Sequence, residues 1–313
     1  MSKKTNKAPG ERRLYLKEIK KQKWLLAMLT PGIVWIIIFC FLPMYGVLIA
    51  FQDFDIIAGI WGSSWIAFDN FKELFGDVVF LQSLKSTIVI SLLKFAFSFP
   101  APIIFALFLN ELKQIRLKKL VQSSTYLPTF LSWVFVVGFT YSFLDVNGPI
   151  NSALTSIGLL KEPVSFLSKP TAFIVIVIIQ EVWKGFGYGS IIFLAAISGL
   201  DTGIYESATI DGAGRFKQMF YITLPMLKPT IAILFIINIA GVLGSNFDQM
   251  YTMGNVFVSD WSNVLSVYSY SVGIVGGQYS LASAMGLFGS VVSVILLLIS
   301  NFSVKKLTGE SYL

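Results

Sequence analysis

The sequence predicts an all-α polytopic membrane protein with six transmembrane helices and with both termini in the cytoplasm. Of its 313 residues, 55% are hydrophobic and only 13% are charged, and the mean hydropathy is +0.73. An average soluble chain holds about 25% charged residues, so this composition excludes an ordinary water-soluble domain. The apolar residues also gather in long runs, and a run of about twenty is enough for a helix to cross a hydrocarbon core of roughly 30 Å.

Six apolar runs are the expected spans, and they lie at about 24–50, 85–109, 121–143, 171–200, 228–250 and 278–303. We expect residues 1–23 to form a basic cytoplasmic tail and residues 24–313 to form a single transmembrane domain. The first run is too long for the hydrophobic region of a signal peptide, and no small-residue cleavage site precedes Gln52. It is therefore expected to remain as a helix.

The distribution of Lys and Arg predicts the orientation, because short loops rich in these residues stay in the cytoplasm. With the N-terminus inside, 18 of the 24 basic residues fall on the inner side. Nine of them precede Trp24, and the others are Lys113, Arg116, Lys118, Lys119, Arg215, Lys217, Lys228, Lys305 and Lys306. The cytoplasmic basic residues that set the orientation of the chain in the membrane lipid account for the net charge of +7. We therefore expect no nucleic-acid partner.

The residue types that most catalytic chemistry needs are missing. The chain has no His and a single Cys, Cys40, which lies inside an apolar run. This excludes zinc and haem sites built on His and Cys, disulfides, and the Ser/His/Asp or Cys/His arrangements of nucleophilic enzymes. No Gly-x-x-x-x-Gly-Lys-Ser/Thr loop occurs, so any ATP chemistry must reside in another polypeptide. We predict no catalytic residue, no metal site and no cofactor bound by this chain.

The two long outer segments, 51–84 and 251–277, are rich in aromatic residues such as Trp61, Trp65 and Trp261. Such residues commonly anchor a membrane protein at the level of the lipid headgroups. A docking surface for an external partner is the alternative, and the sequence leaves both open.

The inner segment between the fourth and fifth spans, about 201–227, is expected to form two short helices. Asp201 or Thr202 can cap the first helix, and Gly212 and Gly214 can supply a turn. One apolar face of the second helix is expected to carry Phe216, Met219 and Phe220, and the residues expected to end it are Pro225 and Pro229.

This loop has too few residues to bury its own apolar face, so something else must cover it. An amphipathic helix lying on the membrane surface is one possibility. Such helices usually carry many cations, whereas the first helix here carries Glu206 and Asp211. A cytoplasmic protein partner is the better prediction.

Three short sequences in this loop resemble the EAA loop of permease subunits of binding-protein-dependent ABC importers. They are Glu206-Ser207-Ala208, Asp211-Gly212-Ala213 and Ile222-x-Leu224-Pro225. Ser207 departs from the Ala of that pattern, but it is also small. Residues 51–55 and 65–71, the stretch from Glu181 to Gly185, and the triplet 247–249 are similar to the carbohydrate, polysaccharide-type branch of these permeases.

The resemblance implies a type I ABC importer permease fold in a bacterial cytoplasmic membrane. It implies that the loop forms coupling helices, which dock on a cytoplasmic ABC ATPase dimer that uses ATP and Mg. It also implies a second homologous permease subunit and an extracytoplasmic solute-binding protein that delivers an oligosaccharide or polysaccharide. The residues that it assigns to ATPase coupling are Glu206, Ser207, Ala208, Asp211, Gly212, Ala213, Leu224 and Pro225.

Charged residues inside the spans are the candidates for the substrate path. A charge at the bilayer centre costs at least about 2.5 kcal/mol, so it normally faces a partner charge, a protein interior or a water-filled path. Lys94 and Glu181 are expected at similar depths, roughly 14–15 Å from the outer side, and can pair. Lys184 is also within reach of Glu181 at the i, i+3 spacing. A structural salt bridge and a polar wall along a sugar path both remain possible, and the further path candidates are Trp183, Asn246 and Asp248.

Three glycines, Gly185, Gly187 and Gly189, follow Lys184 directly. They are not a phosphate loop, because no Lys-Ser/Thr follows them. They indicate close helix packing or, as the alternative, a broken helix whose carbonyl groups line a cavity.

Two other classes of function remain possible at this stage. An ion-coupled secondary sugar transporter needs a buried carboxylate, for which Glu181 is the candidate, but the sequence shows no internal repeat. A membrane-embedded enzyme needs a nucleophile or a metal set, and the lack of His weighs against it.

Overall fold

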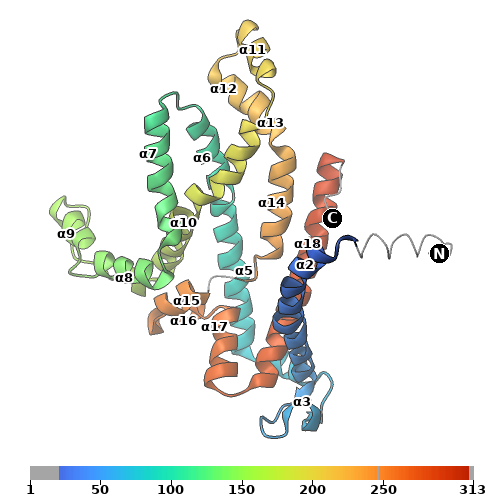
Figure 1. Ribbon diagram of the computed structural model, residues 1–313. Coiled ribbons are helices and arrows are strands. Elements are labelled where there is room, and N and C mark those ends of the chain that lie inside the picture. Colours follow the sequence, from blue (N-terminus) through green and yellow to red (C-terminus); the bar gives the residue numbers. More distant parts are fainter. Residues whose placement is uncertain (1–20, 245–246, 310–313) are drawn as a thin grey trace.

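The computed structural model describes residues 21–244 and 247–309, and this part of the chain is almost entirely helical (Figure 1). The predicted all-α class is confirmed. Most of the predicted basic tail lies outside the described residues, and so does Asn246.

The elements of the first half are α2 (Lys23–Ile36), η1 (Ile37–Phe41), η2 (Leu42–Phe51), β1 (Gln52–Asp53), α3 (Gly59–Gly62), β2 (Ser64–Trp65), α4 (Asp69–Gly76), α5 (Val78–Ser98), α6 (Pro100–Asn110), α7 (Ile115–Tyr126), η3 (Leu127–Phe130), α8 (Trp133–Leu144) and α9 (Pro149–Ser156). Those of the second half are η4 (Phe166–Ser168), α10 (Pro170–Ser198), α11 (Thr202–Ile210), α12 (Arg215–Gln218), η5 (Met219–Thr223), α13 (Leu224–Met226), α14 (Lys228–Ala240), α15 (Phe247–Met253), η6 (Val256–Val258), α16 (Ser259–Ser262), α17 (Leu265–Tyr270), η7 (Ser271–Val275) and α18 (Tyr279–Thr308). In this notation η1, η5 and η7 are π-helical and the other η elements are 3₁₀-helical.

Four stretches of the described chain are long and apolar enough to cross a membrane as single helices, and two bent pairs bring the number to six. The single stretches match four of the predicted spans, and they are Lys23–Phe51, Val78–Asn110, Pro170–Ser198 and Tyr279–Lys306. The second span begins earlier than predicted, at Val78, because Asp77 caps the helix by accepting a hydrogen bond from the Val79 amide.

The third span, expected at about 121–143, is sharply bent. The chain bends by 99° between Ile115–Phe130 and Trp133–Ser156. The 3₁₀ turn η3 contains Pro128, Leu131 is extended, and the Ser132 side chain caps the new helix α8 by accepting from the Phe135 amide. A helix that is stopped and capped anew can leave in a different direction.

The predicted fifth span at 228–250 is also divided. Helix α14 ends at Ala240, and Gly241 follows it, so the helix stops where residues of low helix propensity begin. Helix α15 then starts at Phe247. At its other end, α14 makes a 59° bend with the stretch Arg215–Met226.

The outer segment 51–84 is ordered, as its composition indicates. Strands β1 and β2 form a two-stranded antiparallel hairpin in which Gln52 lies opposite Trp65. The buried Asn70 side chain of α4 donates to the carbonyl groups of Ala50 and Gln52 at 2.9 and 3.0 Å. These bonds fasten α4 to the end of the first span and to the hairpin.

The long helix α10 runs through the bundle beside α5 and α6, while η2 and α18 pack together on another flank (Figure 1). The loop between α6 and α7, the helices α11–α13 and the C-terminal part of α18 all point towards one end. Helix α3 and the turn between α17 and α18 lie at the opposite end. These three described segments, all predicted to be cytoplasmic, therefore share one end of the molecule.

Candidate functional site

The segment from Asp201 to Leu227 forms the tip of the molecule at the end that carries the predicted cytoplasmic loops (Figure 1). Asp201 caps α11, because its side chain accepts a hydrogen bond of 2.9 Å from the Gly203 amide. Gly212 adopts a φ of 76°, which L side chains rarely take, whereas Gly214 has an ordinary φ of −68°. Of the two predicted turn glycines, only Gly212 needs the freedom of glycine.

The second half of this tip is a helix of changing pitch, in which α12 runs into the π-helix η5 and then into α13. The expectation that Phe216, Met219 and Phe220 share one exposed face is wrong. Met219 opens the π-helical turn and is 2% exposed in a cluster with Leu107, whereas Phe216 is 69% exposed.

Pro225 does not end a helix, contrary to the expectation for it. It lies in the first turn of α13, where the missing N–H of proline costs no intrahelical hydrogen bond. The bend to α14 comes at Leu227, which is buried, and Leu224 packs against the same apolar cluster as Leu227. Leu224 therefore anchors the tip to the bundle.

Three hydrogen bonds hold the halves of the tip together. The Tyr205 hydroxyl on α11 lies 2.9 Å from Oγ1 of Thr223 in η5. The side-chain amide of Gln218 donates to Thr209 Oγ1 and to the Ala213 carbonyl, each at 2.9 Å. The tip is therefore one unit rather than two independent helices.

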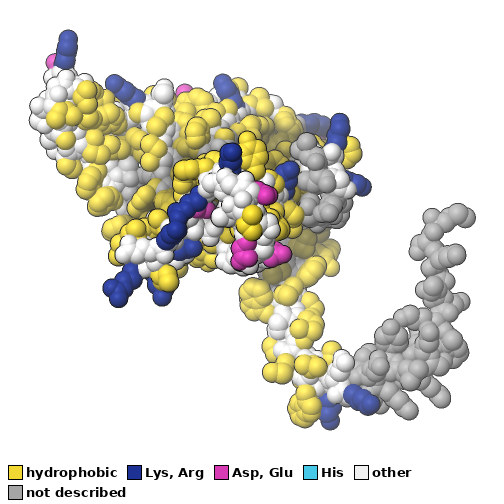
Figure 2. All heavy atoms as spheres, turned by 90° about the horizontal axis from the view of Figure 1, so that it is seen from above, with side chains coloured by type: hydrophobic (Ala, Val, Ile, Leu, Met, Phe, Trp, Pro, Cys, Tyr) yellow, Lys and Arg dark blue, Asp and Glu magenta, His cyan; other side chains and the backbone are white. Residues whose placement is uncertain are grey.

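The tip exposes apolar side chains to its surroundings, and Ile210 at the end of α11 is 87% exposed. Of the predicted coupling residues, Glu206, Ser207, Asp211 and Gly212 are exposed, while Ala208, Ala213, Leu224 and Pro225 are half-buried. Figure 2 looks down on this end and shows Lys and Arg side chains at several points around it. Arg116, which follows the loop between α6 and α7, and Arg215, which opens α12, are both exposed.

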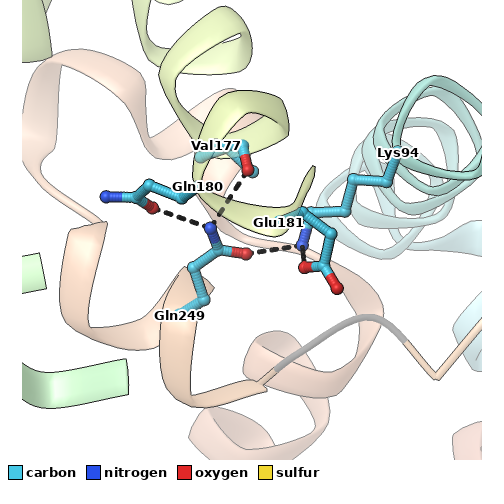
Figure 3. A network of polar contacts seen from close by, with 5 residues as sticks. All are labelled: Lys94, Val177, Gln180, Glu181 and Gln249. Atoms are coloured by element: carbon cyan, nitrogen blue, oxygen red, sulfur yellow. Dashed lines mark hydrogen bonds and ion pairs between the residues drawn. The ribbon is translucent and has the colours of Figure 1, made fainter. Parts of the chain in front are cut away.

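A second site lies inside the bundle, where the structure brings Lys94 and Glu181 together. Nζ of Lys94 lies 3.3 Å from Oε2 of Glu181 (Figure 3). Lys94 is buried, and it also donates a hydrogen bond of 2.6 Å to Oε1 of Gln249. The ion pair thus joins α5 to α10, and Gln249 adds α15.

Sequence reasoning missed the two glutamines of this network. The fully buried Gln249 side chain donates to Oε1 of Gln180 at 2.7 Å and to the Val177 carbonyl at 3.2 Å. Gln180 in turn donates to Oγ1 of Thr140 on α8 at 2.6 Å (Figure 3 shows the bonds among Lys94, Gln180 and Gln249). The signal available in the sequence was an amide inside an apolar run, because a buried amide needs partners.

Asp248 does not join the network, although it precedes Gln249. It is exposed in the first turn of α15, where a carboxylate interacts favourably with the helix dipole. It does not lie at the outer end of a continuous fifth span, because that span is divided after Ala240.

Lys184, which sequence reasoning suggested as a second partner of Glu181, makes its described contacts at the break in the third span. Its Nζ donates to the Thr129 carbonyl at 2.7 Å and lies 3.5 Å from the Pro128 carbonyl, at the break in the third span. Its Nζ also lies 5.4 Å from the centre of the Trp133 ring, a cation–π contact.

Trp183 borders two apolar hollows at the side of α10. Gln180 lines one of them and Phe186 lines the other.

The three glycines after Lys184 lie within one continuous helix, so the broken-helix alternative is wrong. A Cβ on Gly187 would stand 2.1 Å from the Thr125 carbonyl oxygen, and one on Gly189 would stand 3.1 Å from Pro102. A Cβ on Gly185 would meet nothing within 4 Å. Close packing therefore explains Gly187 and Gly189.

Gly185 borders a cavity of about 250 Å³, together with Gly189 and residues of α5, α6 and α14. A neighbouring cavity of about 160 Å³ contains the Lys94–Glu181 pair. The two cavities share Ser98, Glu181 and Asn238. The smaller cavity is lined mainly by polar groups and the larger one mainly by apolar groups, and both border Glu181.

Comparison with known proteins gives a consistent result over nearly the whole chain. The family described as "binding-protein-dependent transport system inner membrane component" matches residues 98–308. Protein LplB of Bacillus subtilis is 41% identical over 297 residues, which are 95% of this chain and 93% of that protein. The polygalacturonan/rhamnogalacturonan transport system permease protein YteP of the same organism is 38% identical over 97% of this chain and 94% of its own length.

A solved structure agrees with the fold described above. It is a bacterial ABC transporter involved in the import of the acidic polysaccharide alginate, and one of its chains matches with a TM-score of 0.86 and 37% identity. The match covers 95% of this chain and 99% of that chain. A membrane-spanning helical fold, a family match over most of the chain and relatives above 30% identity lead to one conclusion. The chain belongs to the binding-protein-dependent transport system inner membrane components, the permease subunits of ABC importers.

Proposed function

We propose that this chain forms half of the path by which an ATP-driven importer in the bacterial cytoplasmic membrane moves an oligosaccharide or polysaccharide. A second homologous permease subunit forms the other half, and an extracytoplasmic solute-binding protein delivers the sugar. The relatives support the substrate class, because YteP is a polygalacturonan/rhamnogalacturonan permease by name. A solved alginate transporter, 36% identical with a TM-score of 0.86, is in complex with a periplasmic protein that holds an alginate pentasaccharide.

Family membership decides between this function and the rivals. Membership of the importer permease family argues against both alternatives, an ion-coupled secondary transporter and a membrane-embedded enzyme. A permease subunit of this family performs transport, and the chain has no phosphate loop. ATP and Mg are therefore assigned to a separate ATPase dimer on the cytoplasmic side.

The tip of residues 201–227 is the proposed contact with that ATPase, and its shape carries the proposal. It stands beyond the bundle with Ile210 and Phe216 exposed, and it is fastened below by Met219 and Leu224. A rigid apolar tip is suited to seat in a groove of another protein. Within it, we assign the contact to Glu206, Ser207, Asp211 and Gly212, and the support of that contact to Ala208, Ala213, Leu224 and Pro225.

Within the bundle, we assign the sugar path to the side of α10 that carries Glu181, together with Lys94 on α5. Lys184 contacts η3 and α8, and Trp183 borders a hollow lined by α8, so we assign both to the support of the broken third span. With the tip at the cytoplasmic end, residues 24–313 form one transmembrane domain, and the basic N-terminal tail and the C-terminus are cytoplasmic.

The coupling assignment is tested by Glu206→Ala, measured in the complex with the companion permease and the ATPase. Glu206 is exposed, so folding and membrane insertion are expected to be unchanged. Copurification of the ATPase and sugar-stimulated ATP turnover are expected to fall about tenfold or more, as for the loss of an interface residue worth at least 1.4 kcal/mol.

Glu162→Ala is the matched control, because Glu162 is an exposed glutamate outside the tip. It is expected to leave both readouts unchanged. Full retention of the ATPase by Glu206→Ala, and by Gly212→Val with its strained turn, would contradict the assignment.

A further inference from the structure

The cavity of about 160 Å³ between α5, α10 and the turn after α14 has room for about five water molecules at roughly 30 Å³ each. The described residues that line it are Ser91, Lys94, Phe95, Ser98, Glu181, Asn238, Gly241, Val242 and Gly244. Polar side chains line it from α5, from α10 and from α14, which contributes Asn238. A polar cavity within the spans of a transporter is a place for a polar solute.

Two buried polar groups on α5 point to a ligand in this cavity. Ser91 is 5% exposed, and its Oγ has no hydrogen-bond partner among the described residues. Lys94 lies one helical turn further along, and its ammonium group has three N–H donors. Two of them are accounted for by Gln249 and Glu181. Buried polar groups of this kind are normally satisfied, and a hydroxyl group in the cavity would satisfy both.

The charges around the cavity indicate what kind of molecule fits. Among the described residues that line this cavity and its 250 Å³ neighbour, only Lys94 and Glu181 are charged, and they form an ion pair. The lining is therefore neutral overall. A carboxylate placed here would either lack a counter-charge or take Lys94 away from Glu181, and separating a buried lysine from its carboxylate is costly.

We propose that this cavity is a subsite for a neutral, hydroxyl-bearing sugar ring, and that it disfavours a uronate ring at this point of the path. A ring hydroxyl accepts from Lys94 and exchanges a hydrogen bond with Ser91, and another hydroxyl donates to Glu181. Gln249 acts as a positioning residue, because its amide oxygen holds the Lys94 ammonium in place. This inference rests on the proposed function and specifies the charge of the sugar unit at one site.

The test uses a thiol placed in the cavity. Ser91→Cys is made in a Cys40→Ser background, so that this chain carries one thiol, and the chain is assembled with its companion permease and ATPase. Methyl methanethiosulfonate, a small neutral reagent, modifies the thiol, and mass spectrometry of the peptide from this chain gives the rate. The probes are three matched pairs that differ at C6: galactose and galacturonate, glucose and glucuronate, and mannose and mannuronate.

We expect at least one neutral sugar to slow modification at least threefold more than its uronate partner at equal concentration. Equal or better protection by the uronates would overturn the proposal, as would the absence of protection by every sugar. A thiol that does not react even without sugar would also overturn it, because the cavity would then be closed to solutes. If the ATPase remains bound in these cases, the subsite fails while the proposed function stands.

A charge change gives the second arm of the test. Glu181→Gln leaves the Lys94 ammonium without its carboxylate partner, so the preference is expected to shift by about threefold or more towards the uronates. Glu162→Gln removes the same charge from an exposed outer position and is expected to leave the preference unchanged. A Glu181→Gln variant that keeps the original preference would contradict the electrostatic argument.

Discussion

Lys184 and Thr129 exchange hydrogen bonds across the break in the third span. The Lys184 ammonium donates to the Thr129 carbonyl at 2.7 Å, and the Thr129 hydroxyl donates to the Lys184 carbonyl at 2.6 Å. The carbonyl groups at the end of a helix have no intrahelical partner, and a cation there satisfies them. The pair therefore fastens the end of η3 to the middle of α10.

Replacement of this lysine is expected to destabilise the fold. Lys184→Met removes a charge-assisted hydrogen bond, which contributes about 1.5–3 kcal/mol, and leaves a partly buried carbonyl unpaired. The thermal unfolding midpoint of the purified protein is expected to fall. Lys169→Met is the control, because Lys169 is exposed at the start of α10. Equal midpoints for the two variants would show that the bond contributes nothing.

The two glycines near this break are expected to differ in their tolerance of a methyl group. In Gly187→Ala the new Cβ would stand 2.1 Å from the Thr125 carbonyl oxygen, so the helices must move apart at a cost of about 1–3 kcal/mol or more. In Gly185→Ala the Cβ meets nothing within 4 Å, and alanine favours the helix. Thermal unfolding of the purified variants measures the difference, and a Gly187→Ala protein as stable as Gly185→Ala would refute the packing argument.

The buried network predicts coupled effects on transport. Lys94→Met leaves the half-buried Glu181 carboxylate uncompensated, and Glu181→Gln does the same to the buried Lys94 ammonium, so the double variant is expected to be less impaired than the sum of the single effects. The expected coupling energy is about 0.5–3 kcal/mol. Sugar uptake by reconstituted complexes measures it, and strictly additive effects would show that the pair does not act as a unit.

Gln249 and its neighbour Asp248 provide a matched pair of substitutions. Gln249→Leu removes an acceptor from Lys94 and a donor from Gln180, both in the interior, and is expected to lower stability and uptake together. Asp248→Asn alters an exposed side chain and is expected to change neither by more than about 0.5 kcal/mol. A Gln249→Leu protein with normal unfolding and uptake would remove Gln249 from the network.

A tyrosine at the outer end predicts a loss of stability at high pH. Burial, together with the hydrogen bond to the Asp77 carboxylate, raises the pKa of Tyr268 to about 12. The folded protein therefore keeps this proton, whereas an unfolded chain releases it near pH 10. The contribution is present below pH 10 and is lost as the pH rises from 10 to 12.

Alkaline unfolding followed by circular dichroism measures this effect. The decline in stability above pH 10 is expected to be shallower in Tyr268→Phe than in the unchanged protein. Identical slopes would mean that the tyrosine titrates alike in both states.

Much of the fold was predictable, because long apolar runs predict the membrane spans and the positions of Lys and Arg predict their orientation. Both signals depend on residues that are close together in the sequence. The cap at Asp201 and the turn at Gly212 were also predictable, since each depends on a few neighbouring residues. The break after η3 was not. Proline near the middle of a span is compatible with a gentle kink as well as with a sharp turn, and Lys184 favours the turn from a distant part of the chain.

The same limit explains why the candidate site was predicted only in part. Lys94 and Glu181 were found because a charge inside an apolar run is conspicuous. Gln249 was not, because its partner Lys94 lies 155 residues away in the sequence. The division of the fifth span decides which of two adjacent polar side chains faces inward.

The uninterrupted course of α10 has a mechanical consequence. Ser198, the last residue of that helix, lies seventeen positions beyond Glu181, and the tip begins just after it. At 1.5 Å per residue this distance is about 26 Å, and one unbroken α-helix covers it. If the proposed ATPase tilts the tip when it closes, α10 would carry that tilt to the Lys94–Glu181 ion pair as a rigid-body displacement. One helix would then couple closure of the ATPase to opening of the sugar path.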